Sequence, residues 1–368
     1  MWRPAVDSRR LAVSIGQAAP IPLDVDFSCE AGDVLAIFGP SGSGKTTILR
    51  SIAGLHHPGR GVVRVGNQVW TDTSAGVFAP PHQRAVGFVF QEYALFPHLT
   101  AVGNVMTALG HRPREERRAR AEQLLAQVHL SSHGDRRPAE LSGGERQRVA
   151  VARALAREPA VLLMDEPFAA VDRDVRRRLQ DEVDALRRTI DVPIVLVTHD
   201  FDDVIRLATH LLILEQGRGV AVGTLAELTS RPDLPWVRTA VGLGSVFDAV
   251  VGRSQASRGL VELNIGGATL LASDRTLTAG AVVRVRIPAR EVILATRPPE
   301  GISLHNVLAG TVTAVHADAA FEHVMVQLAV GEVRLLAEVT RDAVTTLGIA
   351  PGLPIQALIK SVSIDVLT

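Results

Sequence analysis

Hydrophobic positions along residues 10–231 follow two alternating patterns. Residues 161–164 and 194–197 are continuously apolar, which is typical of parallel strands buried on both faces. Between these runs, apolar residues recur every three or four positions, the period of an α-helix, at Val175, Leu179, Val183, Leu186 and Ile190. Short apolar strands that alternate with amphipathic helices predict an α/β domain in which helices cover both faces of a sheet.

The pattern changes near residue 231. The proline-punctuated stretch 231–235 leads into short runs of valine, leucine and isoleucine separated by glycines, which is typical of an all-β region. Residues 261–272 recur in similar form at 326–337, and this repeat predicts two small OB-like barrel lobes packed against each other. We therefore expect three segments: an α/β domain at 1–231, a linker and first β-lobe at 232–300, and a second β-lobe at 303–368.

A glycine-rich stretch lies between a predicted strand, residues 34–38, and a helical run, residues 46–53. It fits the pattern G-x-x-x-x-G-K-[ST], in which glycines let successive backbone N–H groups point at phosphate oxygens. Lys45 would place a positive charge at the β- and γ-phosphates, and the Thr46 hydroxyl would ligate Mg²⁺. The predicted nucleotide-binding residues are Gly39, Pro40, Ser41, Gly42, Ser43, Gly44, Lys45, Thr46 and Thr47.

Two carboxylates, Asp165 and Glu166, directly follow the apolar run 161–164. In α/β sheets, ligands bind at the carboxyl ends of the strands. We expect Asp165 to hold Mg²⁺ through a water molecule and Glu166 to polarise the water that attacks the γ-phosphate. A solvated acidic turn is the alternative, and the glycine loop in the same domain argues against it.

A second candidate phosphate site lies at the start of the predicted helix that ends at Arg157. It consists of Leu141, Ser142, Gly143, Gly144 and Glu145. The serine hydroxyl and the glycine N–H groups would lie at the positive end of that helix, which attracts anions. Leu-Ser-Gly-Gly-Glu is the signature of the ATP-binding cassette ATPases, and the order of the motifs along the chain resembles that family.

The resemblance implies roles for further residues. Gln91 would touch Mg²⁺ and the attacking water, Asp172 would couple two ATP sites, and His199 would sense the γ-phosphate. In the family, the signature loop of one subunit closes on the ATP held by the other, so one copy of each motif implies an isologous homodimer. The implied cofactors are ATP and Mg²⁺, and the implied catalytic residues are Lys45, Gln91, Glu166 and His199.

The composition and the distribution of residue types exclude some partners and structural features. Lys+Arg and Asp+Glu both number 39, so no net charge directs the chain to nucleic acid. Cys29 is the single cysteine, which excludes an intramolecular disulfide and suits a reducing compartment. The longest apolar runs are far too short to span a bilayer. Because no aromatic residue occurs between Arg3 and Asp26, the sequence assigns no adenine-stacking side chain.

Residues 93–105 form a largely apolar stretch with a proline, which is typical of a docking surface. The stretch resembles the ATPase subunits of bacterial uptake transporters, in which it receives the membrane partner. This resemblance implies integral-membrane permease subunits and a periplasmic or extracellular substrate-binding protein as partners. It also implies a peripheral location at the cytoplasmic face of the inner membrane. Packing in the core of a helical subdomain is the alternative for the same side chains.

The second β-lobe resembles the mop/TOBE domain, which binds molybdate. In that family a tetrahedral oxyanion is held by hydroxyls, backbone N–H groups and basic side chains. The matching positions are Ser303, His305, Asn306, Lys360 and Ser361, with His305 where the family more often has arginine. The alternative is a lobe that only dimerises.

These resemblances together predict the ATPase subunit of a molybdate uptake transporter. An importer of sulfate, tungstate, ferric iron, a sugar or a polyamine is the closest alternative, since related importers also carry C-terminal β-lobes. An oxyanion sensor that regulates expression is a third candidate. It would leave the ATPase motifs unexplained, and the sequence lacks a DNA-binding helix pair.

Overall fold

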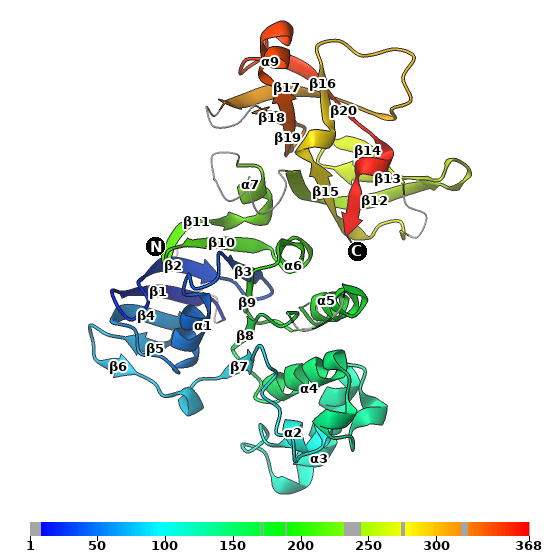
Figure 1. Cartoon of the computed structure of the whole chain (residues 1–368). Coiled ribbons are helices and arrows are strands. Elements are labelled where there is room, and N and C mark those ends of the chain that lie inside the picture. The colour runs from blue at the N-terminus through cyan, green and yellow to red at the C-terminus, as the bar shows by residue number, and fades with distance from the viewer. Residues whose placement is uncertain are drawn as a thin grey trace, which may run out of the picture. The chain divides into compact units, whose positions relative to one another are not determined.

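The computed structural model describes residues 9–169, 171, 173–187, 190–231, 244–273, 277–317 and 323–367. The chain divides into two compact units, Met1–Gly223 and Thr224–Thr368 (Figure 1). The division comes before the predicted linker because α7 (Leu225–Thr229) packs against β12 (Gly244–Gln255) of the second unit. Gln327 adds to this attachment by donating a hydrogen bond from Nε2 to the carbonyl oxygen of Ser230, at 2.8 Å.

A sheet of eleven strands, counted over the described residues, forms the centre of the first unit, in the order β6-β5-β4-β1-β2-β11-β10-β3-β9-β8-β7. Strands β7, β8, β9, β3 and β10 pair in parallel, whereas β1 pairs antiparallel with β2 and β4. The strands are β1 (Leu11–Gln17), β2 (Leu23–Cys29), β3 (Val34–Phe38), β4 (Arg60–Val65), β5 (Gln68–Asp72), β6 (Val77–Phe78), β7 (Val86–Val89), β8 (Val161–Asp165), β9 (Ile194–Thr198), β10 (His210–Glu215) and β11 (Arg218–Thr224).

The central parallel strands β3, β8 and β9 are buried along their whole length, and their successive side chains point to opposite faces of the sheet. In β8, Leu163 belongs to a core that it shares with Ile48 and Ile52 of α1. The neighbouring Leu162 belongs to a second core with α2 to α5, so the predicted α/β architecture is confirmed. The helices are α1 (Lys45–Ala53), α2 (Ala101–Met106), α3 (Arg114–Gln127), α4 (Gly143–Leu155), α5 (Arg173–Arg187) and α6 (Phe201–Leu207).

The second unit contains two five-stranded sheets over the part of the chain that is described, and the predicted all-β region is confirmed. Their orders are β14-β13-β12-β15-β21 and β16-β20-β17-β18-β19. Besides β12, the strands are β13 (Leu260–Ile265), β14 (Ala268–Ala272), β15 (Val282–Pro288), β16 (Val292–Ala295), β17 (Asn306–Ala317), β18 (His323–Val330), β19 (Val333–Thr340), β20 (Pro354–Ile359) and β21 (Asp365–Leu367), with α9 (Arg341–Leu347) after β19.

The two repeats exchange their last strands. β16, which follows the first repeat, pairs with β20 of the second, and β21, which ends the second, pairs with β15 of the first. One hydrophobic core contains side chains from both sheets, including Val285 and Ala357. The repeat in the sequence thus corresponds to two lobes that are built into each other rather than to two independent barrels.

Candidate active site

The glycine loop connects β3 to α1 in a conformation that requires glycine. Gly42 and Gly44 have φ angles of 79° and 98°, in the left-handed region that residues with a side chain rarely adopt. At Gly39, a Cβ atom would lie 2.2 Å from the carbonyl oxygen of Leu214. The sequence pattern of the loop therefore follows from its backbone geometry.

Lys45 begins α1 and extends its side chain along this loop. Its Nζ donates hydrogen bonds to the carbonyl oxygens of Gly39, at 2.8 Å, and Pro40, at 2.9 Å. Burial lowers the pKa of Lys45, while the charges of Glu166 and Asp165 raise it. The ammonium group is thus held beside the loop and faces the two carboxylates.

Thr46 and Asp165 bring oxygen ligands together. The Thr46 hydroxyl donates a hydrogen bond to Asp165 Oδ1 at 3.0 Å, joining the start of α1 to the end of β8. Burial raises the pKa of Asp165, and the hydrogen bond from Thr46 opposes that change. Among the described residues, no group of three or more His, Cys, Asp or Glu side chains could hold a metal ion. One carboxylate and one hydroxyl fit Mg²⁺, which takes its remaining ligands from phosphates and water.

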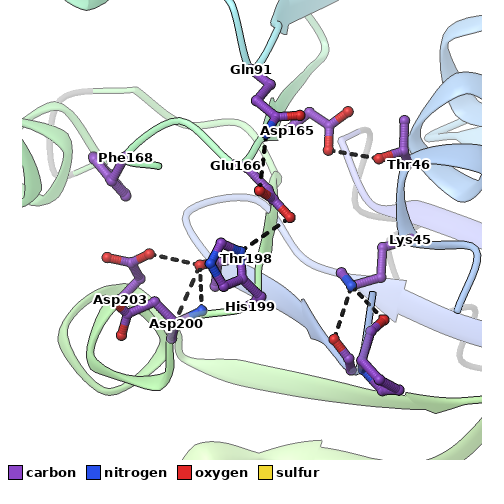
Figure 2. A network of polar contacts seen from close by, with 12 residues as sticks. Lys45, Thr46, Gln91, Asp165, Glu166, Phe168, Thr198, His199, Asp200 and Asp203 are labelled. Carbon is purple, nitrogen blue, oxygen red and sulfur yellow. Dashed lines mark hydrogen bonds and ion pairs between the residues drawn. The ribbon is translucent and has the colours of Figure 1, made fainter. Parts of the chain in front are cut away.

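Glu166 lies between Gln91 and His199 (Figure 2). Gln91 Nε2 donates a hydrogen bond to Glu166 Oε2 at 3.2 Å, and His199 Nδ1 lies 3.2 Å from Glu166 Oε1. The Glu166 backbone has a φ of 45°, and its N–H donates to the carbonyl oxygen of Val197 at 2.9 Å. Side chains predicted from three separate segments therefore lie together, with Gln91 and His199 both contacting the Glu166 carboxylate.

The signature loop forms the N-terminus of α4. Ser142 Oγ accepts a hydrogen bond from the Glu145 N–H at 3.3 Å, and the Glu145 carboxylate accepts one from the Ser142 N–H at 2.7 Å. The Ser142 N–H is the main cause that lowers the pKa of Glu145. A Cβ on Gly144 would lie 3.0 Å from Val175 Cγ1, so glycine lets α4 approach α5 closely. α4 lies apart from α1 in Figure 1. Asp172, the predicted coupling residue, lies outside the described residues.

Two polar residues hold the predicted docking stretch: Asn104, near its end, and Arg153, from a helix later in the chain. Asn104 of α2 is fully buried, accepts a hydrogen bond from the Phe96 N–H at 2.7 Å and donates to the Phe96 carbonyl at 3.1 Å. Arg153 of α4 donates to the carbonyl oxygens of Tyr93 and Ala94. Tyr93 is buried in the core, whereas Phe96 is 44% exposed, so the stretch contains both kinds of side chain. No helix within the described ranges has the length and hydrophobicity to cross a membrane.

In the second unit, the five predicted oxyanion residues differ in their surroundings. Asn306 is buried, and its amide binds backbone groups: Oδ1 accepts from the Leu271 N–H at 2.6 Å, and Nδ2 donates to the carbonyl oxygens of Leu271 and Ile359. Because both amide hydrogens and the oxygen are used, Asn306 ties β14 to β17 and β20 and is not free to bind an anion. Ser361 is buried, while Ser303, His305 and Lys360 are exposed.

The comparisons with known proteins agree with this geometry. Residues 23–169 match the family described as ABC transporter, and residues 302–366 match the TOBE domain. The molybdenum import ATP-binding protein ModC of Methylococcus capsulatus is 42% identical, over 93% of this chain and 95% of its own length. ModC of Thiobacillus denitrificans is also 42% identical, over 93% of this chain and 94% of its own.

A solved structure extends the comparison to the first unit. It is a dimeric ATP-binding cassette in a post-hydrolysis state with bound ADP and Pi, and it covers 58% of this chain and 98% of its own. Its TM-score is 0.50 and its sequence is 31% identical. The chain therefore belongs to the ATP-binding cassette ATPases and, among them, to the family of the molybdenum import ATP-binding proteins ModC.

Proposed function

We propose that this chain is the ATP-hydrolysing subunit of an importer and that molybdate is the imported solute. The observation that carries hydrolysis is the convergence of Gln91 and His199 on Glu166, in the same unit as the Lys45 loop. The observation that favours molybdate is the similarity, over 93% of the chain, to proteins named for molybdenum import.

In the proposed mechanism, the N–H groups of the glycine loop and Lys45 bind the β- and γ-phosphates. Mg²⁺, held by Thr46 and through water by Asp165, would offset the negative charge of the phosphate oxygens. Glu166 accepts a proton from the attacking water, and the Gln91 side chain orients that water. The contact between His199 and Glu166 would fix the carboxylate, and the imidazole would face the γ-phosphate.

We propose that the complete site requires a second copy of this chain. The signature loop, Leu141 to Glu145, begins a different helix from the glycine loop, and a helix start of this kind would bind an anion. In a two-fold symmetric dimer, each signature loop would contact the ATP bound by the other copy, with Asp172 between the two sites. The solved cassette to which the first unit is similar is itself dimeric.

The proposed partners are integral-membrane permease subunits and a periplasmic substrate-binding protein. The exposed Phe96, beside the carbonyl groups that Arg153 fixes, would contact the permease. The chain would then lie at the cytoplasmic face of the inner membrane without crossing it. A contact at this position would link the membrane subunit to Gln91, which precedes the docking stretch in the sequence.

For the second unit, we propose an oxyanion site formed by Ser303, His305, Lys360 and Ser361. Ser361 supports it, because its hydroxyl oxygen is buried and has no hydrogen-bond partner within the described part of the chain. Composition supports Lys360: lysine occurs at only two positions, Lys45 and Lys360, and every other member of the Lys+Arg total is arginine. The chain thus uses a compact ammonium at its proposed phosphate site and its proposed oxyanion site, and a guanidinium elsewhere.

Uptake of radiolabelled molybdate tests the proposed function. In a strain that lacks this gene, uptake should be lost, and it should return with the wild-type gene but not with Glu166→Gln. Excess tungstate should compete and excess sulfate should not. Inhibition by sulfate at molybdate-like concentrations would favour a sulfate importer, and undiminished uptake in the deletion strain would refute the proposal.

Lysine-selective labelling of the full-length chain tests the oxyanion site independently of transport. Because the chain has two lysines, each ligand should protect one of them: ATP should slow the labelling of Lys45, and molybdate should slow the labelling of Lys360. Mass spectrometry distinguishes the two peptides, and sulfate at the same concentration is the control. Equal labelling of Lys360 with and without molybdate would support a lobe that only dimerises.

A further inference from the structure

A buried carboxylate lies close to the proposed γ-phosphate sensor. Asp203 of α6 is 1% exposed, and both of its oxygens are hydrogen bonded. Thr198 Oγ1 donates to Oδ2 at 2.6 Å, and Gln180 Nε2 of α5 donates to Oδ1 at 2.6 Å. Asp203 is therefore fixed between the end of β9 and the middle of α5, and a buried group with this many partners is costly to alter.

The same hydroxyl fixes the backbone on both sides of His199. Thr198 immediately precedes His199, and its Oγ1 accepts a hydrogen bond from the Asp200 N–H at 3.0 Å. His199 itself is half exposed, with its ring directed to Glu166 (Figure 2). Because half of the His199 side chain is exposed, the position of its ring depends on the backbone that Thr198 holds and, through the Thr198 hydroxyl, on Asp203.

Arg176 connects this network to the segment that follows Glu166. Its Nη2 donates to the carbonyl oxygen of Phe168 at 3.0 Å, and the same guanidinium forms ion pairs with Asp200 and, at 3.8 Å, with Asp203. One side chain of α5 therefore joins the segment after the proposed general base to the segment after His199. A planar guanidinium with several fixed donors suits such a multiple contact.

We propose that Asp203 is a positioning residue that acts through Thr198 to hold His199 against Glu166. Arg176 then fixes the segment after Glu166 relative to the segment after His199. The proposal rests on the catalytic role proposed above for His199. Asp203 and Arg176 would not touch ATP. Their effect would be on the orientation of the side chains that do.

The first test is ATP hydrolysis by the full-length chain with Asp203→Asn. The amide has the size of the carboxylate, but one of its two acceptor oxygens becomes an N–H group, so Thr198 and Gln180 can no longer both donate to it. The substitution also removes the negative charge that pairs with Arg176. We expect kcat to fall about 10-fold or more, because a displacement of about 1 Å near the chemistry can cost up to about 100-fold. KM for ATP should change less than kcat. Asp202→Asn, an exposed neighbour on the same helix, is the matched control and should retain wild-type kcat.

A double-mutant cycle with His199→Ala separates this inference from the function on which it rests. If Asp203 acts through His199, Asp203→Asn should lower kcat no further in the His199→Ala chain. An equal fold-loss in both backgrounds would overturn the inference. An unchanged kcat in His199→Ala alone would instead show that the proposed role of His199 is wrong.

The Thr198 hydroxyl provides a second comparison that also applies if Asp203→Asn does not fold or if His199→Ala is inactive. Thr198→Ser keeps the hydroxyl and should keep kcat. Thr198→Val keeps the shape without the hydroxyl and should lose about 10-fold or more in kcat. Similar kcat values for the two folded variants, checked by circular dichroism, would overturn the inference.

Discussion

Glu166 Oε1 and His199 Nδ1 lie 3.2 Å apart, although the two residues follow different strands. The register of the parallel strands β8 and β9 pairs Asp165 with Val197, so the residues just beyond these positions emerge at the same edge of the sheet. The Glu166 N–H donates to the Val197 carbonyl and fixes this register at its last position. The contact between the proposed general base and the proposed sensor is therefore a consequence of strand pairing.

Glu166→Gln should bind ATP but hydrolyse it at least ~10²-fold more slowly, because the amide cannot accept the proton of the attacking water. The variant should also accumulate as an ATP-bound dimer. Phosphate release and size-exclusion chromatography measure the two effects. Glu122→Gln, an exposed glutamate on α3, is the control, and near-normal turnover of Glu166→Gln would rule out its role as general base.

Phe96→Ser should leave ATP binding by the isolated chain unchanged and abolish ATP-driven uptake by the assembled transporter. The reason is that the ring is 44% exposed, while the backbone around it is held by Asn104 and Arg153. Phe96→Leu, which remains apolar, should retain part of the uptake. Unfolding of the isolated Phe96→Ser chain would instead assign the ring to the core.

Lys360→Met should abolish molybdate binding by the second unit of the full-length chain, because the ammonium is the fixed positive charge of the proposed site. Isothermal titration with molybdate, tungstate and sulfate measures this. The wild-type chain should bind the first two in competition and sulfate more weakly. Lys360→Arg should restore binding only in part, since guanidinium and ammonium differ in geometry. Unchanged heats in Lys360→Met would exclude the lysine from the site.

Asn306→Ala should destabilise the second unit by about 3 kcal/mol or more. The substitution removes three hydrogen bonds, two to the partly buried backbone of Leu271 and one to the buried carbonyl oxygen of Ile359. Denaturant unfolding of the full chain, followed by hydrogen exchange within β14 and β20, measures the loss. Ser303→Ala, at an exposed position nearby in the sequence, should have little effect on stability. Equal stability of both variants would show that the Asn306 side chain does not stabilise the contact between β14, β17 and β20.

Cys29 should be unreactive in the native chain. Burial raises the pKa of its thiol to about 12, so almost no thiolate is present at pH 8, and the thiolate is the reactive form. A colourimetric thiol reagent at pH 8 should therefore react with Cys29 slowly and incompletely in the native chain. After unfolding, it should react rapidly with one thiol per chain. Rapid modification of the native chain would show that Cys29 is accessible.

The glycine loop and the signature loop could be predicted from the sequence because their geometry is local. Gly42 and Gly44 have left-handed backbone angles that the residue type itself permits, and Ser142 caps its helix together with Glu145, three residues later. The apolar runs at β8 and β9 could be predicted for a similar reason, because a strand buried on both faces must be apolar throughout. These features require no knowledge of distant parts of the chain.

Arg84 illustrates what the sequence did not reveal. It is fully buried, and its guanidinium donates hydrogen bonds to the carbonyl oxygens of Ser51 and Ile52 at the end of α1, and to groups of the strand β5. Burial lowers its pKa to about 10. An arginine is usually exposed, so its place in the core depends on acceptors that only the folded chain brings together.

In the second unit, too, some features could be predicted from the sequence and others could not. The repeat and the all-β character were predictable, because strand periodicity and glycine turns are local. The exchange of β16 and β21 between the sheets depended on packing, since each lobe completes its sheet with a strand of the other. Asn306, predicted as an anion ligand from its motif, binds backbone groups instead, because burial leaves an amide no alternative to nearby N–H and carbonyl partners. The sequence determined which residue types were available for the proposed sites, and the register and burial of distant segments decided which of those side chains lie together.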